Sequence, residues 1–312
     1  MSGSTHPIPR TVWILWHQGL DKAPLVVQKC VESWIKENPC WGVVVLDAES
    51  LKKYVTPDLP PEKLATLDLT KQSNLIRLQL LSDYGGVWAD ATLLCLRPLD
   101  EWIDECTASG FFAFAFPDGS SRVLSTWFLA SQRQCPIVVK WRQRYASFFL
   151  DHNLDKDTEW ARDLTKRALA RVLNRSRRTT RYWFSPVLTR VLRVYPYHVL
   201  HYLFERLVDT DQECRTIWEG TKKVANEESR TIRRFGFFSP LTDDVKKDIE
   251  KAIGTGNPGV VKLTWKYEPS RYSSSTVLYY LLEGRSPRGV QDVNVEASSN
   301  ARPLTDHYSR RV

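Results

Sequence analysis

Two short runs of apolar residues flank one amphipathic segment of helix length, and this order constrains the fold of the chain most. The first run is Thr11–Trp16 (TVWILW) and the second is Gly42–Leu46 (GVVVL), and both have the composition of buried strands. Between them, Ala23–Lys36 places its apolar side chains on one helical face, with Pro24 in the first turn. A strand–helix–strand order predicts an α/β unit with a parallel strand pair.

Further apolar patterns predict more elements of the same class. A helix at Thr70–Ser82, capped by Thr70, should end at Tyr84-Gly85-Gly86, because glycine permits a left-handed helix ending. A short strand, Val87–Ala89, follows at once. Further strands are expected at Phe111–Phe116, Trp127–Ala130 and Val260–Lys266, and further helical segments at Pro136–Phe149, Ala161–Arg181 and Val187–Leu207.

One acidic residue, Asp90, lies at the carboxyl end of the strand expected at Val87–Ala89. Ligands of open α/β sheets bind at the carboxyl ends of strands, so chemistry is expected at this position. Asn74 and Arg77 are three residues apart on the preceding helix and should share a face, which the glycine turn brings back beside the strand. A carboxylate beside a guanidinium and an amide suits a ligand that carries a metal-bound phosphate and hydroxyl groups.

The stretch SNLIRLQLLSDYGGVWADATLL, which begins at Ser73, resembles the core of the capsular polysaccharide synthesis glycosyltransferases. These enzymes are related to the family 32 glycosyltransferases and to the clostridial glucosylating toxins. Their pattern is Ser-Asp-x-x-Arg, a helix, and then Tyr-Gly-Gly-x-x-x-Asp. The segments IPRTVWILWHQGLDKAPLVVQKCVESW, STWFLASQRQCPIV, HYLFERL and KLTWK resemble other blocks of the family, so the resemblance covers roughly residues 8 to 270.

The resemblance implies a GT-A fold, an α/β nucleotide-sugar-binding domain with a mostly parallel central sheet and added C-terminal helices. It also implies transfer of a sugar from a nucleotide donor, expected to be UDP-linked, to an acceptor hydroxyl with retention of configuration. Ser73, Asn74 and Arg77 fall where the family contacts the donor sugar, and Trp16 falls near the nucleoside site. Asp90 matches the first acidic residue of the metal-binding Asp-x-Asp motif, and Asp90 and Arg77 are the expected catalytic residues.

Two residues depart from the family pattern. Thr92 stands at the second acidic position of Asp-x-Asp, and a hydroxyl is a poorer metal ligand than a carboxylate. Asn74 replaces the acidic residue of Ser-Asp-x-x-Arg, so it keeps the shape but loses the charge. A divalent metal, Mn²⁺ or Mg²⁺, on Asp90 and Thr92 remains the expectation, because it would neutralise the charge of the leaving nucleoside diphosphate.

Residues near the end of the chain complete the expected site. Lys262 and Lys266 should lie on one face of a strand with Thr264 and hold the diphosphate from the far side. Trp127, His201 and Trp265 are the expected acceptor-binding residues. The alternatives are core packing for the two tryptophans and a hydrogen-bonded interior position for His201.

Charge and composition limit the classes of partner that the chain is expected to bind. The chain has 312 residues, 44 basic and 36 acidic, so its net charge of +8 favours an anionic partner. The basic segment 161–181 suits peripheral contact with an anionic membrane, whereas no nucleic-acid-binding motif is present. No apolar run reaches the roughly 18 residues of a membrane span, and the six cysteines show no zinc spacing.

These patterns predict one domain at residues 1–283, with a basic helical insertion at 161–207 and a polar C-terminal tail at 284–312. The N-terminal MSGSTHPIPR has no apolar signal region, so a cytoplasmic location is expected, peripheral at the membrane. Two other functions stay open. One is a sugar-nucleotide-binding protein whose catalysis is impaired by Thr92, and the other is a nucleic-acid binder attracted by the charge.

Overall fold

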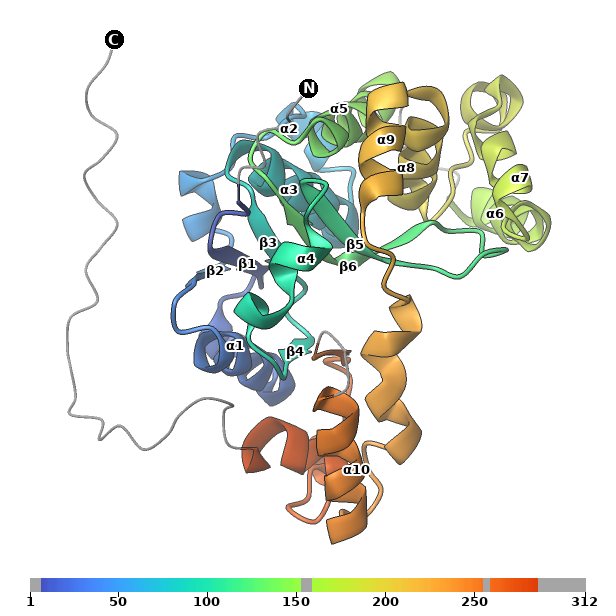
Figure 1. Cartoon of the computed structure of the whole chain (residues 1–312). Coiled ribbons are helices and arrows are strands. Elements are labelled where there is room, and N and C mark those ends of the chain that lie inside the picture. Colours follow the sequence, from blue (N-terminus) through green and yellow to red (C-terminus); the bar gives the residue numbers. More distant parts are fainter. Residues whose placement is uncertain (1–6, 153–158, 255–258, 286–312) are drawn as a thin grey trace.

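The computed structural model describes residues 7–152, 159–254 and 259–285. Its centre is a five-stranded sheet with the strand order β2-β1-β3-β6-β5 (Figure 1). The pairs β1–β2 and β1–β3 are parallel, while β6 is antiparallel to both of its neighbours, so four of the five strands run in one direction. The expected α/β class with a mostly parallel sheet is therefore confirmed. The strands are β1 Thr11–Leu15, β2 Gly42–Leu46, β3 Gly86–Ala89, β5 Phe111–Ala115 and β6 Leu124–Ser131.

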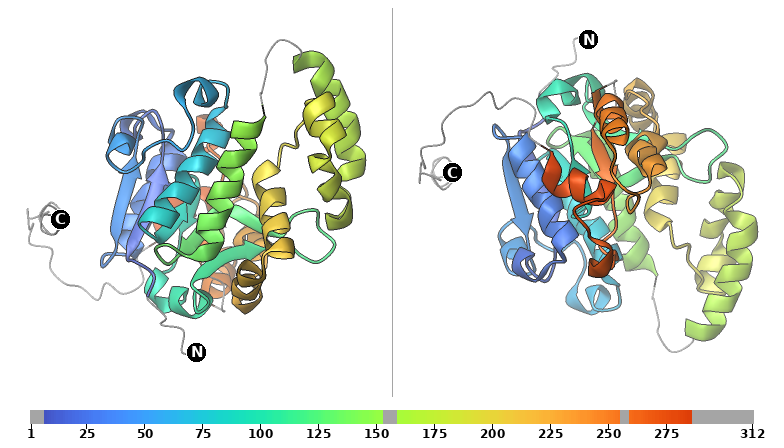
Figure 2. Two further views of the ribbon diagram at one scale, coloured as in Figure 1. Left: turned by 90° about the horizontal axis from the view of Figure 1, so that it is seen from above. Right: turned by 90° about the horizontal axis from the view of Figure 1, so that it is seen from below.

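Helices cover both faces of the sheet. On one face, α3 (Leu69–Asp83), α5 (Pro136–Asp151) and α8 (Val199–Thr210) lie side by side, as Figure 2 shows. On the other face lies α1 (Leu25–Glu37). Alternate residues of β1 pack into the two hydrophobic cores on opposite faces of the sheet. Trp13 faces the α3 side and Val12 faces the α1 side. Because both faces are buried, the strand reads as an uninterrupted apolar run.

A second, two-stranded sheet lies below the first in Figure 1 and brings the C-terminal part of the chain to the central sheet. Its strands β4 (Leu93–Cys95) and β7 (Val260–Lys262) are antiparallel, and they pack with α10 (Asp243–Gly254) against one side of α1. Within the described ranges, no helix combines the length and apolar character needed to cross a bilayer. The other α-helices are α2 Pro61–Leu64, α4 Ile103–Cys106, α6 Glu159–Leu173, α7 Arg177–Thr180, α9 Gln212–Gly220 and α11 Val277–Tyr279.

Some expected boundaries are wrong. Asp68, not Thr70, caps α3, because its carboxylate accepts a hydrogen bond from the Lys71 amide at 2.8 Å. The strand expected to reach Lys266 ends at Lys262, because its partner β4 offers only three residues for pairing. The segment 187–207 divides into a π-helical turn at 187–191 and α8, with a break at 192–198. The predicted domain boundaries stay a prediction, and residues 286–312 of the expected tail lie outside the described residues.

Gly86 allows β3 to approach β1 closely, and its replacement should destabilise the fold. Its φ is +93°, and a Cβ atom there would lie 2.5 Å from the carbonyl oxygen of Thr11. We expect Gly86→Ala to lower the free energy of unfolding by about 2–4 kcal/mol, measured by urea denaturation. Gly119→Ala is the matched control, because Gly119 has a φ of +88° but no atom within 4 Å of the position that a Cβ would take. Its loss should be limited to the backbone cost of about 1–2 kcal/mol, and equal losses in both variants would contradict this explanation.

Candidate active site

A hollow of about 690 Å³ opens at the carboxyl ends of β1 and β3. It is the position at which ligands bind in open α/β sheets. Its wall is formed by the ends of these two strands, by α3, and by β7 with its following turn. The polar and aromatic lining residues are Trp16, His17, Gln18, Lys22, Thr70, Ser73, Arg77, Trp88, Asp90, Thr92, Lys262 and Trp265.

Asp90 and Arg77 meet in this hollow, as the sequence predicts. Nη2 of Arg77 lies 3.5 Å from Oδ1 of Asp90, and the whole arginine is only 5% exposed. The guanidinium also donates to the carbonyl of Thr126 on β6, which fixes its direction. Trp88 holds both partners, because its indole nitrogen donates to Oδ1 of Asp90 at 3.0 Å and its ring lies 5.0 Å from the guanidinium carbon of Arg77. Contacts from β3, β6 and α3 thus surround the pair.

Lys262 approaches the same carboxylate from the second sheet. Its ammonium donates to Oδ2 of Asp90 at 2.9 Å and to Oγ1 of Thr92 at 2.7 Å. The pairing of β4 with β7 sets this contact, because Leu93, the residue after Thr92, lies opposite Lys262 in the ladder. One carboxylate therefore faces two cations, and one of these, Lys262, is 172 residues away in the chain.

The two cations determine the charge state of Asp90. Burial alone would raise the pKa of this carboxyl, but the charges of Lys262 and Arg77 outweigh it, and the pKa lies below its ordinary value. Asp90 is therefore ionised at neutral pH. The lining holds three basic residues, Lys22, Arg77 and Lys262, and one acidic residue, Asp90, so its net charge is +2. This balance favours an anionic ligand.

A divalent cation does not fit the residues as they are arranged. The hard oxygen donors at the expected position are one carboxylate and one hydroxyl, and the ammonium of Lys262 is bonded to both. Across the described residues, no group of three or more His, Cys, Asp or Glu side chains is placed to hold a metal ion. A divalent ion at this point would lie beside the cations of Arg77 and Lys262, and Asp90 would be the only carboxylate of the lining to balance all three charges. The metal expected on Asp90 and Thr92 stays a prediction.

Comparison with known proteins assigns the chain to a family. A family model described as "Capsular polysaccharide synthesis protein" matches residues 3–158, which is half of the 312-residue chain. The chain belongs to the capsular polysaccharide synthesis protein family. The matched range includes the whole of β1, α3 and β3, and with them Arg77 and Asp90. Lys262 lies outside it.

Several curated proteins share part of this sequence. The chain is 38% identical over 103 residues to the glycosyltransferase afumC of Aspergillus fumigatus (29% of this chain, 26% of that protein). It is 28% identical over 158 residues to the O-glycosyltransferase braB of Annulohypoxylon truncatum (44% and 37%). It is 27% identical over 105 residues to the initiation-specific alpha-1,6-mannosyltransferase of Candida albicans (31% and 27%). The chain thus spans about a quarter to two fifths of the length of these relatives.

Two solved structures of low identity were also found. One is the PaToxG glycosyltransferase, with 14% identity and a TM-score of 0.34, covering 71% of this chain and 90% of that one. The other is the UDP-bound glycosyltransferase domain of the YGT toxin, with 10% identity and a TM-score of 0.34, covering 78% of this chain and 89% of that one.

In this member of the capsular polysaccharide synthesis family, the hollow brings together seven of the eleven site residues that the sequence predicts. They come from the ends of β1 and β3, from α3, and from β7 with its following turn. Trp265 is 50% exposed at the rim, which leaves its ring accessible to a ligand. The seven are Trp16, Ser73, Arg77, Asp90, Thr92, Lys262 and Trp265.

The other four predicted residues do not line the hollow. Asn74 instead donates to the hydroxyl of Tyr145 on α5 at 3.1 Å, so it lies on the α5 side of α3. Lys266 does not share a face with Lys262, because the strand has already ended, and its ammonium lies 5.5 Å from the centroid of the Trp265 ring. The ring of Trp127 stacks on Phe114 with 4.6 Å between centroids.

His201 is the fourth of these residues, and it lies on α8. Its ring packs against that of His198, with centroids 5.2 Å apart. The alternative of a hydrogen-bonded interior histidine is not borne out for Nδ1, which is buried without a partner among the described residues. Burial lowers the pKa of His201 well below its ordinary value, so the ring is neutral at pH 7. Its role in acceptor binding stays a prediction.

Sequence reasoning missed the residues that directly follow β1. His17, Gln18 and Lys22 line the hollow beside Trp16. The indole nitrogen of Trp16 and Nε2 of His17 are buried without partners among the described residues, and burial lowers the pKa of His17. Their position after a parallel strand is the signal that could have identified them, since the same argument identified Asp90.

Proposed function

We propose that this chain is a glycosyltransferase that moves a sugar from a nucleotide sugar to a hydroxyl of a polysaccharide, glycan or glycolipid acceptor. One observation carries the proposal: an ionised Asp90, fixed between Arg77 and Lys262, in a polar hollow at the carboxyl ends of parallel strands. The relatives that are named glycosyltransferases support it, because the matches to afumC and braB cover 29% and 44% of this chain.

The hollow suits a nucleotide sugar in size and in charge. Its volume of about 690 Å³ is in the range of small-molecule and cofactor sites, and its lining carries a net charge of +2. A nucleoside diphosphate is an anion, and a sugar ring presents hydroxyl groups to carboxylate and guanidinium partners. The half-exposed Trp265 offers an aromatic face to a sugar or a base.

In the proposed reaction, each charged group has a distinct task. Bond cleavage leaves a nucleoside diphosphate with additional negative charge, and fixed cations near that charge lower the barrier. Lys262 is placed to transfer its hydrogen bonds from Asp90 and Thr92 to the diphosphate when the donor binds. Arg77 and Asp90 then orient the hydroxyl groups of the transferred sugar.

Finer assignments belong to the same proposal. A UDP-linked donor and retention of the anomeric configuration rest on the resemblance of the SNLIRLQLLSDYGGVWADATLL stretch to the family. A divalent ion in the reaction requires that Lys262 first leave Asp90 and Thr92. The impaired sugar-nucleotide-binding protein remains the second candidate, because Thr92 supplies a hydroxyl where the family pattern has a carboxylate.

A panel of nucleotide sugars in a thermal-shift assay tests the proposal. A ligand that binds only the folded chain should raise the melting temperature by roughly 5 °C at a hundred times its Kd. Hits are then incubated with acceptor sugars, and the products are followed by mass spectrometry. Binding with transfer or donor hydrolysis supports the enzyme, and binding without turnover supports the second candidate. A melting temperature that responds to oligonucleotides and to no nucleotide sugar would overturn both.

A further inference from the structure

The excess positive charge of this chain is concentrated in one short segment. Residues 164–197 contain nine basic residues and no acidic one, which gives this segment a charge of +9. The whole chain carries +8, so everything outside the segment sums to −1 (+8 minus +9). All eight arginines of the segment are exposed, so the charge faces solvent.

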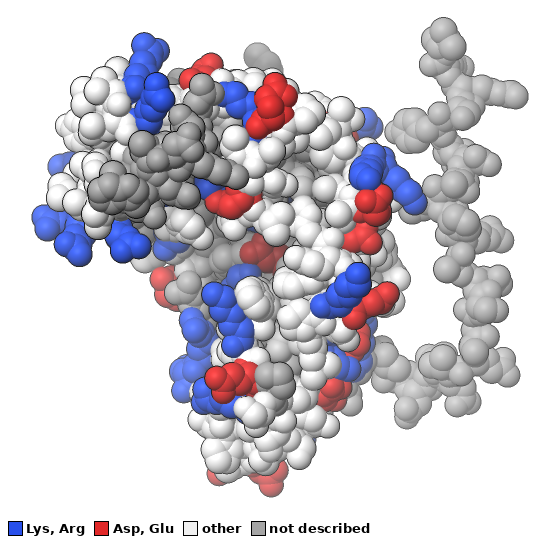
Figure 3. All heavy atoms as spheres, turned by 180° about the vertical axis from the view of Figure 1, so that it is seen from behind, with Lys and Arg blue, Asp and Glu red and all other residues white. Residues whose placement is uncertain are grey.

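The segment forms a helical lobe that stands apart from the central sheet. It comprises most of α6, α7 and the turns up to residue 197, and it lies beyond the α8 side of the molecule in both views of Figure 2. We call it the basic lobe. It has a small core of its own, in which Trp183, Leu188 and Val194 pack with Tyr202 of α8. Figure 3 shows Lys and Arg side chains along the border of this lobe.

Apolar side chains are exposed on the same lobe. Of the thirteen large hydrophobic residues that are exposed in the described part of the chain, seven lie within residues 164–197. Val191 is 73% exposed, and Val187 and Leu192 lie exposed beside it in the sequence. Because the lobe already has a core, these side chains are not needed for its own folding. The other four are Leu164, Val172, Tyr182 and Tyr197.

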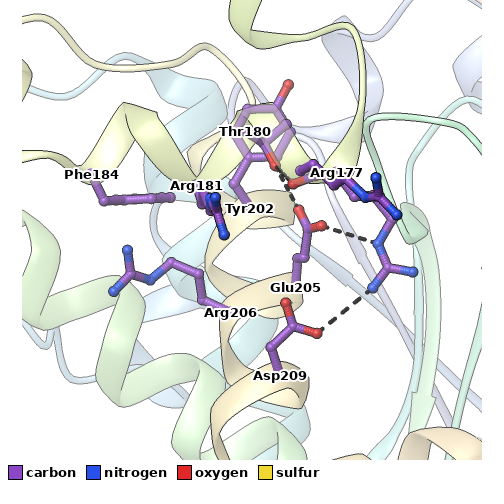
Figure 4. Close-up of a pocket in the computed structure, with 9 residues that line it drawn as sticks. Arg177, Thr180, Arg181, Phe184, Tyr202, Glu205, Arg206 and Asp209 are labelled. Carbon is purple, nitrogen blue, oxygen red and sulfur yellow. Dashed lines mark hydrogen bonds and ion pairs between the residues drawn. The ribbon is translucent and has the colours of Figure 1, made fainter.

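A small hollow lies where the lobe meets α8. Its volume is about 330 Å³, and it is lined by four arginines and two acidic residues. Figure 4 shows Glu205 directed toward Thr180 and Arg177, with which it forms hydrogen bonds of 2.9 and 3.0 Å. Nη2 of Arg177 also lies 3.9 Å from Asp209. The net charge of the lining is +2, so a phosphate group is electrostatically favoured there.

We propose that the basic lobe docks on membranes that contain anionic lipid. Arginines attract phosphate and carboxylate headgroups, and exposed valine, leucine and tyrosine side chains enter the boundary between headgroups and acyl chains. The combination of charge and exposed apolar side chains favours a membrane over nucleic acid. A membrane offers an apolar region to Val187, Val191 and Leu192, whereas the phosphate backbone of a nucleic acid does not. The docking surface is separate from the hollow that holds Asp90, so it does not depend on the proposed reaction.

Vesicle co-sedimentation tests the charge component. The 312-residue chain is mixed with vesicles of pure phosphatidylcholine or of phosphatidylcholine with about 30% phosphatidylserine. We expect binding to the second only, weakening as salt rises from about 0.05 to 0.5 M because exposed charges are screened. Arg167→Glu with Arg171→Glu, an exposed pair on α6, should weaken binding at least about tenfold. Lys247→Glu with Lys251→Glu, an exposed pair with the same spacing on α10, makes the same change in net charge and should not.

A second pair of variants tests the apolar component. Val191→Glu should also weaken binding, whereas Ile35→Glu, at an exposed apolar position of α1 outside the lobe, should leave it unchanged. All variants are first checked for an unchanged melting temperature, so that a folding defect is not mistaken for a binding defect. Absence of binding to anionic vesicles, or equal losses in the lobe and control variants, would overturn the proposal. So would a single-stranded oligonucleotide that displaces the chain from vesicles at equal phosphate concentration.

Discussion

Asp90→Asn is expected to lower the rate of sugar transfer by about 100- to 1,000-fold. The amide keeps the size of the side chain but removes the negative charge that holds Lys262 at 2.9 Å and faces Arg77 at 3.5 Å. Both cations then lose their fixed positions at the hollow, and the sugar loses a strong hydrogen-bond acceptor. Steady-state transfer or donor hydrolysis measures the effect.

The loss must be separated from simple destabilisation. Arg77 is buried, so removal of its counter-ion should also lower the free energy of unfolding by about 1–3 kcal/mol. Asp58→Asn is the matched control, because Asp58 forms a two-point ion pair with Arg142 at 2.6 and 2.8 Å, half-buried and outside the hollow. We expect it to cost similar stability and to leave the transfer rate within about twofold. Equal activity losses in the two variants would contradict the assignment of Asp90.

Lys262→Met is expected to lower the rate of sugar transfer by about 10- to 100-fold. This is the loss of rate expected when one charge-assisted hydrogen bond to the diphosphate is removed. The substitution keeps an unbranched side chain of similar length and removes only the cation. Lys266→Met is the matched control, because Lys266 is four residues further on and does not line the hollow. It should retain activity close to that of the unmodified chain.

An activity assay with the chelator EDTA distinguishes two candidates for the main cation of the site, the ammonium of Lys262 and a divalent metal. Since Lys262 already bonds both Asp90 and Thr92, we expect the unmodified chain to keep most of its activity in EDTA. In Lys262→Met those two oxygens are released, so added Mn²⁺ should restore part of the lost rate. If EDTA instead abolishes the activity of the unmodified chain and Mn²⁺ restores it, the metal expected from the sequence is correct, and it takes the place at Asp90 and Thr92 that Lys262 leaves when it turns to the diphosphate.

The central fold was predictable because its signals are local. Uninterrupted apolar strands, one amphipathic helix and the Gly85–Gly86 turn predict a parallel arrangement, and β1, β2 and β3 have it. The same locality made the meeting of Arg77 and Asp90 predictable, since only a helix and one turn separate them. Asn74 does not line the hollow with Arg77, because neighbours on one helical face can still turn toward different partners, here Tyr145, and its role in donor binding stays a prediction.

The C-terminal part of the site was less predictable. The sequence suggests a strand from Val260 to Lys266, but the number of residues in β4 limits pairing to three positions. The prediction that Lys266 shares a face with Lys262 was therefore wrong, and the contact of Lys262 with Thr92 was not predicted. Neither result could come from periodicity, because strand pairing between residues 93 and 262 depends on the path of the intervening chain.

The sequence by itself determined the α/β order, the position of Asp90 at a strand end, and the concentration of +9 charges within residues 164–197. Each of these three features depends on periodicity, on a turn or on local composition, and these are properties of residues close together in the chain. Only the tertiary structure decided that Lys262 bonds both Asp90 and Thr92, and that seven apolar side chains of the basic lobe stay exposed. Both depend on how distant segments pack, because burial and ion pairing are properties of neighbours in space rather than in the chain.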